Sequence, residues 1–233
     1  MYDYSVDIRN LCVKSPPLLL HHIRQALKLF KDGELDGLGA IVLLDVIPDS
    51  DKIWLTKGEI DGVWTRGWYS PRRQNQLPRI TLNIAEIRRG LPWALWLTPS
   101  PTVLIARVLA HEVGHHLIAN GDRAVAELGI TGKGKETHFN EEKAATLYSM
   151  RVEAEMVKQR RYDLFRRCLE SLAMYKYAWG GSHYQDGRYE QAASHFYLAW
   201  RLDPYNRTDA WRNYQISRDK SKAEAREHQR QKI

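Results

Sequence analysis

Six consecutive residues, HEVGHH at positions 111–116, carry side chains suited to metal chemistry. If the segment is helical, His111 and His115 lie one turn apart on the same face, where two imidazole nitrogens can bind one ion. Glu112 is displaced by roughly 100° from His111 around the helix, so its carboxylate lies beside such an ion and can take a proton from an activated water. The spacing therefore predicts a zinc site with Glu112 as a general base, and His116 is expected to point away from the metal.

The residues around the motif predict the helix that this spacing requires. Ser100 can serve as its N-cap with Pro101 at the first helical position, and Asn120-Gly121 supplies a left-handed stop. Apolar residues on both sides of the motif place the histidines on a face that is otherwise largely buried. Gly114 costs about 1 kcal/mol relative to alanine inside a helix, which indicates a close neighbour at that position.

The segments upstream alternate between helix and strand patterns. An amphipathic helix is predicted from Pro17 to a stop at Gly33, and we interpret its His21 and His22 as surface or core-edge residues. Strand-like segments follow at 40–47, at 52–60 and 62–69 (a hairpin that turns around Asp61), and at 79–84. The last of these alternates cleanly between apolar and polar residues, which is typical of a half-buried strand at the edge of a sheet.

With a histidine helix after a mixed helix and strand segment, the chain resembles the zincin metallopeptidases over roughly residues 40–157. The resemblance implies an α+β catalytic domain, a Zn²⁺ cofactor and the hydrolysis of peptide bonds. The metzincin branch would need glycine at 118 and histidine at 121, but Ile118 and Gly121 stand there, so that branch is excluded. The gluzincin branch instead takes its third zinc ligand, a glutamate, from a second helix.

A second helix is predicted after Asn140, a good N-cap, and two neighbouring glutamates compete for the ligand role. Glu141 lies on the face with small and apolar residues, which we interpret as the packed side, and Glu142 lies on the polar face. The expected metal ligands are therefore His111, His115 and Glu141, with Glu142 as an alternative.

The gluzincin resemblance is incomplete in its second motif. NEEKAA at 140–145 is similar to the N-E-x-x-x-D pattern, but Ala145 replaces the aspartate that orients a ligand histidine. Asp122 is a candidate for that orienting role. His138 is another alternative third ligand, because SprT-like proteases, which clear DNA crosslinks, complete their site with a histidine after the active helix. Tyr148 is a candidate donor for the developing oxyanion.

The C-terminal part resembles one tetratricopeptide repeat over residues 173–206. The residues that match its spacing are Gly180, Ala192, Phe196, Ala199 and Pro204. Helices are also expected at 160–172 and 208–217. Because one such hairpin cannot bury both of its faces, it is expected to bind a protein partner or to support the catalytic domain.

Composition sets the remaining bounds. The chain carries a net charge of +7, and residues 217–233 hold six Lys or Arg against three Asp or Glu, which predicts a charged, disordered tail. Cys12 and Cys168 are too far apart in sequence to indicate a disulfide framework. No signal peptide or membrane span is recognised, so a cytoplasmic location is expected. The expected domains are 1–157 for the peptidase and 158–216 for the helical extension.

We thus predict a zinc-dependent peptidase that acts on a protein or peptide. The alternatives are a catalytically inactive interaction module, a DNA-associated protease, and a repressor-cleaving regulatory protease. The inactive module is disfavoured because HEVGH keeps all three fixed residues of the motif. Nucleic-acid binding is supported only by the basic balance and by His138. The repressor-cleaving type is similar in the short gap between His115 and Glu141, but its Glu-x-Glu-Ala-Asn signature is not reproduced.

Overall fold

A computed structural model of the chain describes residues 6–46, 66–72, 76–89, 91–128, 137–203 and 207–230. The chain divides into two compact units, Met1–Asp163 and Leu164–Ile233, and each is described by itself. The first unit combines a sheet with helices and the second is helical, so the described chain is an α+β protein, as expected.

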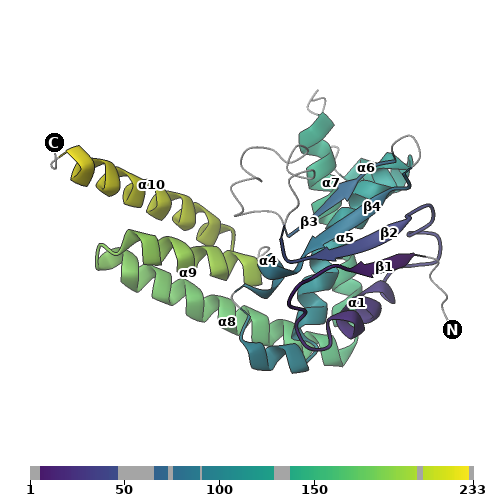
Figure 1. Ribbon diagram of the computed structural model, residues 1–233, viewed down its shortest axis with the longest axis horizontal. Helices are drawn as coiled ribbons and strands as arrows, with labels where there is room; N and C mark the ends of the chain where they lie inside the picture. The colour runs from purple at the N-terminus through teal and green to yellow at the C-terminus, as the bar shows by residue number, and fades with distance from the viewer. Residues whose placement is uncertain are drawn as a thin grey trace. The chain divides into compact units, whose positions relative to one another are not determined.

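The described strands of the first unit form one mixed sheet in the order β1-β2-β4-β3 (Figure 1). Their bounds are Asp7–Asn10 for β1, Ala40–Leu44 for β2, Gly67–Ser70 for β3 and Arg79–Asn83 for β4. β1, β2 and β4 run parallel, and β3 is antiparallel to β4. Every residue of β2 is buried, as expected for an inner strand of a parallel sheet. The expected hairpin arm at 52–60 lies outside the described residues.

The position of β4 corrects one prediction. This strand was expected at a sheet edge with one wet face, but it pairs with β2 on one side and β3 on the other. Thr81 and Asn83, which the alternation assigned to the wet face, are both buried. Asn83 accepts a hydrogen bond from the Glu86 amide (3.2 Å) and caps α4 (Ile84–Arg88). An alternating pattern separates two faces, but it does not show how many neighbours a strand has.

The central helix of the first unit is α5 (Ser100–Ala119), which contains the HEVGHH segment. It contacts β3, β4, α4, α1 (Leu19–Leu27) and the 3-10 helix η1 (Trp93–Leu97). Gly121 has a φ of 82°, which confirms the left-handed stop. The helix start differs from the prediction, because Ser100 is the first helical residue and Pro99 is the N-cap. The hydroxyl of Thr98 accepts the Ser100 amide at 3.3 Å.

The helix predicted after Pro17 is α1, and its two histidines lie in different surroundings. His21 is exposed and His22 is buried. The two ring nitrogens of His22 lie 2.8 Å from the Thr102 hydroxyl and 2.9 Å from the Trp96 carbonyl oxygen. His22 is therefore a core residue that ties α1 to the segment before and at the start of α5.

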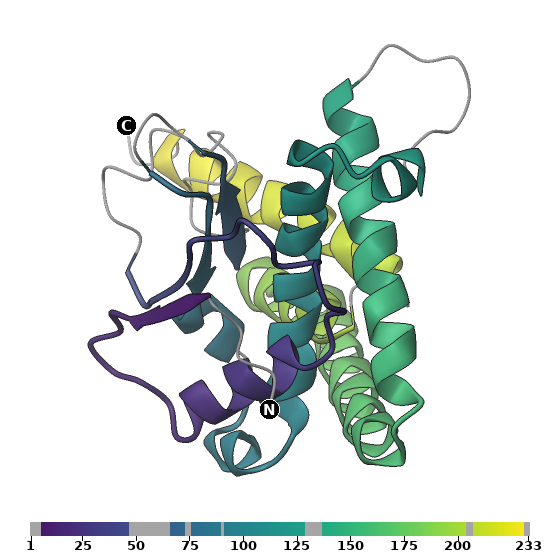
Figure 2. The same ribbon diagram turned by 90° about the vertical axis from the view of Figure 1, so that its right-hand side faces the viewer.

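The second helix of the predicted site is α7 (Thr137–Val157), which runs beside α5 (Figure 2). The short helix α6 (Arg123–Leu128) packs against both α5 and α7. A Cβ added at Gly114 would lie 2.8 Å from the Cα of Ala145. Ala145 is thus the close neighbour that Gly114 indicated. Asn140 lies inside α7 and is not its N-cap, because the helix begins at Thr137.

The second unit contains most of α8 (Arg160–Gln185), followed by α9 (Tyr189–Leu202) and α10 (Thr208–Arg230). A Cβ added at Gly180 would lie 2.7 Å from the ring of Phe196, so α8 and α9 are closely packed there. Two expectations are corrected. Residues 160–172 are part of α8 and not a separate helix, and residues 217–230 continue α10 instead of forming a disordered tail. None of the described helices is long and apolar enough to cross a membrane.

Candidate metal centre

Burial along α5 explains why the site forms at its histidines. From Ser100 to Leu117 every side chain of the helix is buried except those of His111 and His115, which are partly exposed. The sequence produces this pattern because the helix is apolar on nearly all sides and is covered by the sheet and by other helices. The two imidazoles are therefore the side chains of α5 between Ser100 and Leu117 that solvent reaches.

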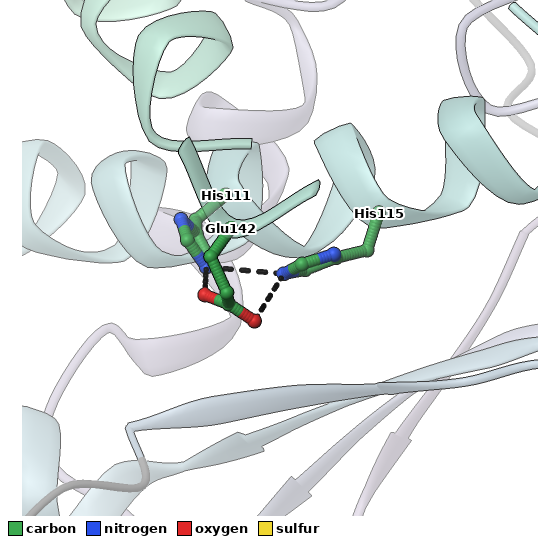
Figure 3. Close-up of side chains that lie close together, drawn as sticks. All are labelled: His111, His115 and Glu142. Atoms are coloured by element: carbon green, nitrogen blue, oxygen red, sulfur yellow. Dashed lines mark hydrogen bonds and ion pairs between the residues drawn. The ribbon is translucent and has the colours of Figure 1, made fainter. Parts of the chain in front are cut away.

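Three side chains from two helices converge at this opening (Figure 3). The Nε2 atoms of His111 and His115 are 3.2 Å apart. The carboxylate of Glu142, which comes from α7, places one oxygen 3.3 Å from the Nε2 of His111 and the other 3.3 Å from the Nε2 of His115. Two imidazole nitrogens and one carboxylate group thus point toward one small volume.

The spacing of these atoms fits a zinc ion. In a tetrahedral site with zinc–ligand bonds of about 2.0–2.1 Å, neighbouring donor atoms lie about 3.3–3.4 Å apart. The two Nε2 atoms of His111 and His115, 3.2 Å apart, are close to this value, and each lies 3.3 Å from a different oxygen of the Glu142 carboxylate. Two imidazoles and one carboxylate are also a ligand set found in catalytic zinc sites, where a fourth position stays open.

The third side chain of the group is Glu142 and not Glu141, which was the expected ligand. Both glutamates are exposed on α7, but only Glu142 is part of the group. The polar face of α7, which the sequence assigned to solvent, is in fact turned toward α5. Its residue Ser149 donates a hydrogen bond to the Arg107 carbonyl oxygen at 2.9 Å, and Glu153 forms an ion pair with the Arg107 side chain. Glu142 lies on this same face, and it therefore reaches the histidines.

The electrostatics of the group favour a negative carboxylate between the two histidines. Hydrogen bonds from His111 and His115 hold the pKa of Glu142 well below its usual range. Burial of His115 opposes its protonation, but the hydrogen bond to Glu142 and the charge of Glu112 outweigh burial and raise the pKa of His115. These shifts describe the side chains without a metal, where protons compete with a cation for the same nitrogen atoms.

Glu112 lies next to this group in a different environment. Its side chain is buried, and burial raises its pKa, although the neighbouring His111 and His115 act in the opposite direction. The backbone amide of Tyr69 in β3 acts in the same direction as the histidines, because it favours the charged form of the Glu112 carboxylate. The structure thus places Glu112 beside the ligand group, as the helical spacing predicted, and ties it to a strand that the sequence did not connect with the site.

The other candidate residues lie elsewhere. Tyr148 is buried, and burial together with the charge of Glu34 raises its pKa far above the usual range. Asp122 accepts a hydrogen bond from the Val125 amide at 3.1 Å, so it caps α6. The side chain of His138 lies outside the described residues. His116 points away from the ligand group, because its Nε2 lies 3.0 Å from the Asp36 carbonyl oxygen.

Two contributors to the site were missed at the sequence level. Tyr69 could not have been found, because a backbone contact leaves no signature in residue type. The pairing of Arg107 with Glu153 did leave a signature in the sequence. Arg107 is a charged residue on a helical face that is otherwise apolar, and a buried charge needs an opposite charge nearby. Glu153 lies three helical turns after Glu142 on the same face of α7. Had the pair been recognised, the sequence would have predicted that Glu142 also faces α5.

Comparison of the chain with protein-family models, characterised proteins and solved structures finds no match. A functional interpretation therefore depends on the HEVGH motif and on the geometry of the side chains around it.

Proposed function

We propose that this chain is a zinc-dependent peptidase of the zincin type. The observation that carries the proposal is that the Nε2 atoms of His111 and His115 lie 3.2 Å apart and each lies 3.3 Å from one oxygen of the Glu142 carboxylate, beside the buried Glu112. A zinc ion held there would supply a Lewis acid that polarises a carbonyl group and lowers the pKa of water to about 7.

Glu112 is the proposed general base. Its carboxylate takes a proton from the attacking water and delivers the proton to the leaving amide nitrogen. Burial raises the pKa of this carboxyl group, which makes it a better proton acceptor than an exposed glutamate. His111, His115 and Glu142 act as ligands and take no part in proton transfer. The substrate class that follows from this chemistry is a peptide or a protein.

Metal analysis of adjacent variants tests the ligand assignment. We expect about one zinc per purified wild-type chain, loss of zinc in His111→Ala and Glu142→Gln, and retention of zinc in Glu141→Gln. Glu141→Gln is the matched control, because it makes the same exchange one position earlier on α7. A wild-type chain that binds no zinc even when zinc is added would contradict the proposal. Loss of zinc in Glu141→Gln with retention in Glu142→Gln would reverse the ligand assignment.

Hydrolysis is tested separately with a mixed decapeptide library and mass spectrometry. We expect the wild-type chain to cleave a subset of the peptides and Glu112→Gln to keep zinc but to lose at least about a hundredfold in rate. Equal cleavage by both proteins would show that Glu112 is not the base. No cleavage by a zinc-loaded wild-type chain would contradict the peptidase assignment.

The second unit is proposed to be a tetratricopeptide-like module that binds a protein partner or supports the first unit. Support comes from the close packing of Gly180 on Phe196 and from the turn at Gly187, which has a φ of 75°. Gly180 is one of the residues that match the spacing of the repeat. A cytoplasmic location and an interaction with DNA stay predictions.

A further inference from the structure

His116, the last residue of HEVGHH, is fully buried and joins three parts of the first unit. Its Nε2 lies 3.0 Å from the Asp36 carbonyl oxygen and 3.0 Å from the side-chain amide nitrogen of Asn120. A carbonyl oxygen only accepts hydrogen bonds, so we assign the hydrogen to Nε2 and a lone pair to Nδ1. With this assignment the Asn120 amide turns by 180° about its last bond, so that its oxygen and not its nitrogen is next to Nε2. The Tyr69 hydroxyl lies 3.4 Å from that Nδ1 and can donate to it. The two rings meet edge to face with centroids 5.5 Å apart.

The backbone N–H of Tyr69 is directed to Glu112, which lies one helical turn before His116 on α5. The Asn83 amide donates to the Arg66 carbonyl oxygen at 2.7 Å, so these two residues form a hydrogen-bonded pair of the β3–β4 ladder. In an antiparallel ladder such pairs alternate with pairs whose amides point outward. Tyr69 is three residues after Arg66, so its N–H points away from β4. An N–H that points away from β4 can stabilise the negative charge of the Glu112 carboxylate.

A close approach of β3 to α5 makes both contacts possible. A Cβ at Gly67 would lie 2.8 Å from the Val108 side chain, so this glycine lets the strand lie directly against the helix. Gly67 and Tyr69 project to the same face of the strand. Gly67 thus meets Val108, and Tyr69 meets His116 two helical turns later. The strand is held against the full length of the HEVGHH segment.

We propose that Tyr69 and His116 are positioning residues that orient the general base Glu112. Tyr69 takes part in both contacts: His116 holds its side chain, and its backbone N–H orients the Glu112 carboxylate. The position of β3 beside α5 therefore determines the orientation of the Glu112 carboxylate. A backbone N–H cannot be removed by an ordinary substitution, so this orientation is tested through the side-chain contact of Tyr69 with His116. This inference rests on the proposed function, since it assigns a purpose to the orientation of Glu112.

Three variants separate the contacts of His116. Tyr69→Phe removes only the hydroxyl. The side-chain amide of glutamine ends near the position of Nε2 in histidine, and that of asparagine ends near Nδ1. His116→Gln therefore keeps a donor for Asp36 but loses the acceptor for Tyr69, whereas His116→Asn keeps the acceptor. The matched control is His22→Gln, because His22 is also buried between a backbone carbonyl and a hydroxyl, those of Trp96 and Thr102.

Kinetics on a quenched-fluorescent peptide, chosen as the best-cleaved member of the decapeptide library, give the first readout. In Tyr69→Phe and His116→Gln we expect unchanged zinc content, a KM within about twofold of wild type, and a kcat lower by about tenfold to a hundredfold. His116→Asn should recover kcat to within about threefold of wild type. His22→Gln should lose stability without losing kcat. Unchanged kcat in Tyr69→Phe and His116→Gln, or an equal loss in His22→Gln, would overturn the proposal.

The Co²⁺-substituted protein gives a second readout that needs no peptide. A displaced Glu112 changes the hydrogen bonding around the ion, so the visible bands of bound Co²⁺ should shift in Tyr69→Phe and His116→Gln at unchanged stoichiometry, and not in His22→Gln. Identical spectra in all four proteins would overturn the positioning role. If the wild-type chain binds metal but cleaves nothing, the peptidase assignment fails and these spectra alone decide the positioning role. A wild-type chain that takes up neither zinc nor cobalt overturns both proposals.

Discussion

Arg107 and Glu153 form a bidentate ion pair between α5 and α7, with nitrogen to oxygen distances of 2.7 and 2.6 Å. Both side chains are buried, so neither charge is stabilised by bulk water. A planar guanidinium matches a carboxylate in this geometry, and the pair fixes how the two helices lie against each other. The same helices carry the ligands of the candidate metal centre, so this contact sets the distance from the histidines to Glu142.

Removal of one charge from this pair should destabilise the first unit strongly. In Glu153→Gln the buried guanidinium loses the charge of Glu153, and we expect a loss of about 3–5 kcal/mol in the free energy of unfolding, measured in urea. Glu155→Gln is the matched control, since Glu155 is exposed and pairs with Lys158 at 2.6 Å on the surface of the same helix. We expect no measurable change there. Similar losses in both variants would show that the buried pair has no special role.

Gly114→Ala should weaken metal binding. The added Cβ would meet the Ala145 backbone at 2.8 Å, and a backbone atom cannot move aside as a flexible side chain can. Overpacking costs about 1–3 kcal/mol, which exceeds the gain of about 1 kcal/mol from replacing glycine in a helix. Since Ala145 is one turn from Glu142, the helices should separate at the ligands. Zinc affinity measured by competition with a chelator should fall, and an unchanged affinity would contradict this account of the contact.

Two adjacent glycines in α8 should respond in opposite directions to alanine. A Cβ at Gly180 would lie 2.7 Å from the Phe196 ring, whereas nothing lies within 4 Å of one at Gly181. Gly180→Ala should cost about 1–3 kcal/mol because the ring must shift. Gly181→Ala should stabilise the helix by about 0.5–1 kcal/mol. Urea denaturation of both variants measures the difference, and equal effects would argue against close packing of α8 on α9.

The two cysteines should differ in their reaction with iodoacetamide. Burial, together with the charge of Asp45, raises the pKa of Cys12 to about 11 against the opposing effect of Arg88. Since the thiolate is the reactive form, Cys12 should react slowly at pH 8 and about tenfold faster for each pH unit up to its pKa. Cys168 is exposed. Mass spectrometry of the modified chain should show Cys168 labelled first, and equal labelling in the folded state would contradict the raised pKa.

Local patterns predicted the elements of the site well. The histidine helix and its stop at Gly121 are confirmed, because apolar periodicity and a left-handed glycine are properties of a short segment. The buried strand Ala40–Leu44 is confirmed for the same reason. The predicted N-cap of α5 was wrong. Ser100 was expected outside the helix, but it is the first helical residue, and the Thr98 hydroxyl accepts a hydrogen bond from its amide.

Relations between elements were predicted less well. The polarity of Glu142, Ser149 and Glu153 suggested a wet face, but each of these side chains bonds to a partner on α5. Periodicity measures how polar a face is and not whether its polar groups have partners. The edge position assigned to residues 79–84 failed in a similar way, because β3 pairs with that strand from an earlier part of the chain. Such information is present only in the folded arrangement.

The contact between α5 and α7 links metal occupancy to folding. His111 and His115 come from one helix and Glu142 from the other, so an ion bound by all three cross-links them and binds the native chain in preference to the unfolded one. A ligand present at 100 times its dissociation constant then adds about 2.7 kcal/mol to stability. Melting curves recorded with zinc, cobalt, manganese and magnesium should rank the metals by affinity. Thermodynamic linkage thus allows the relative affinities of these metals to be measured before any substrate is known.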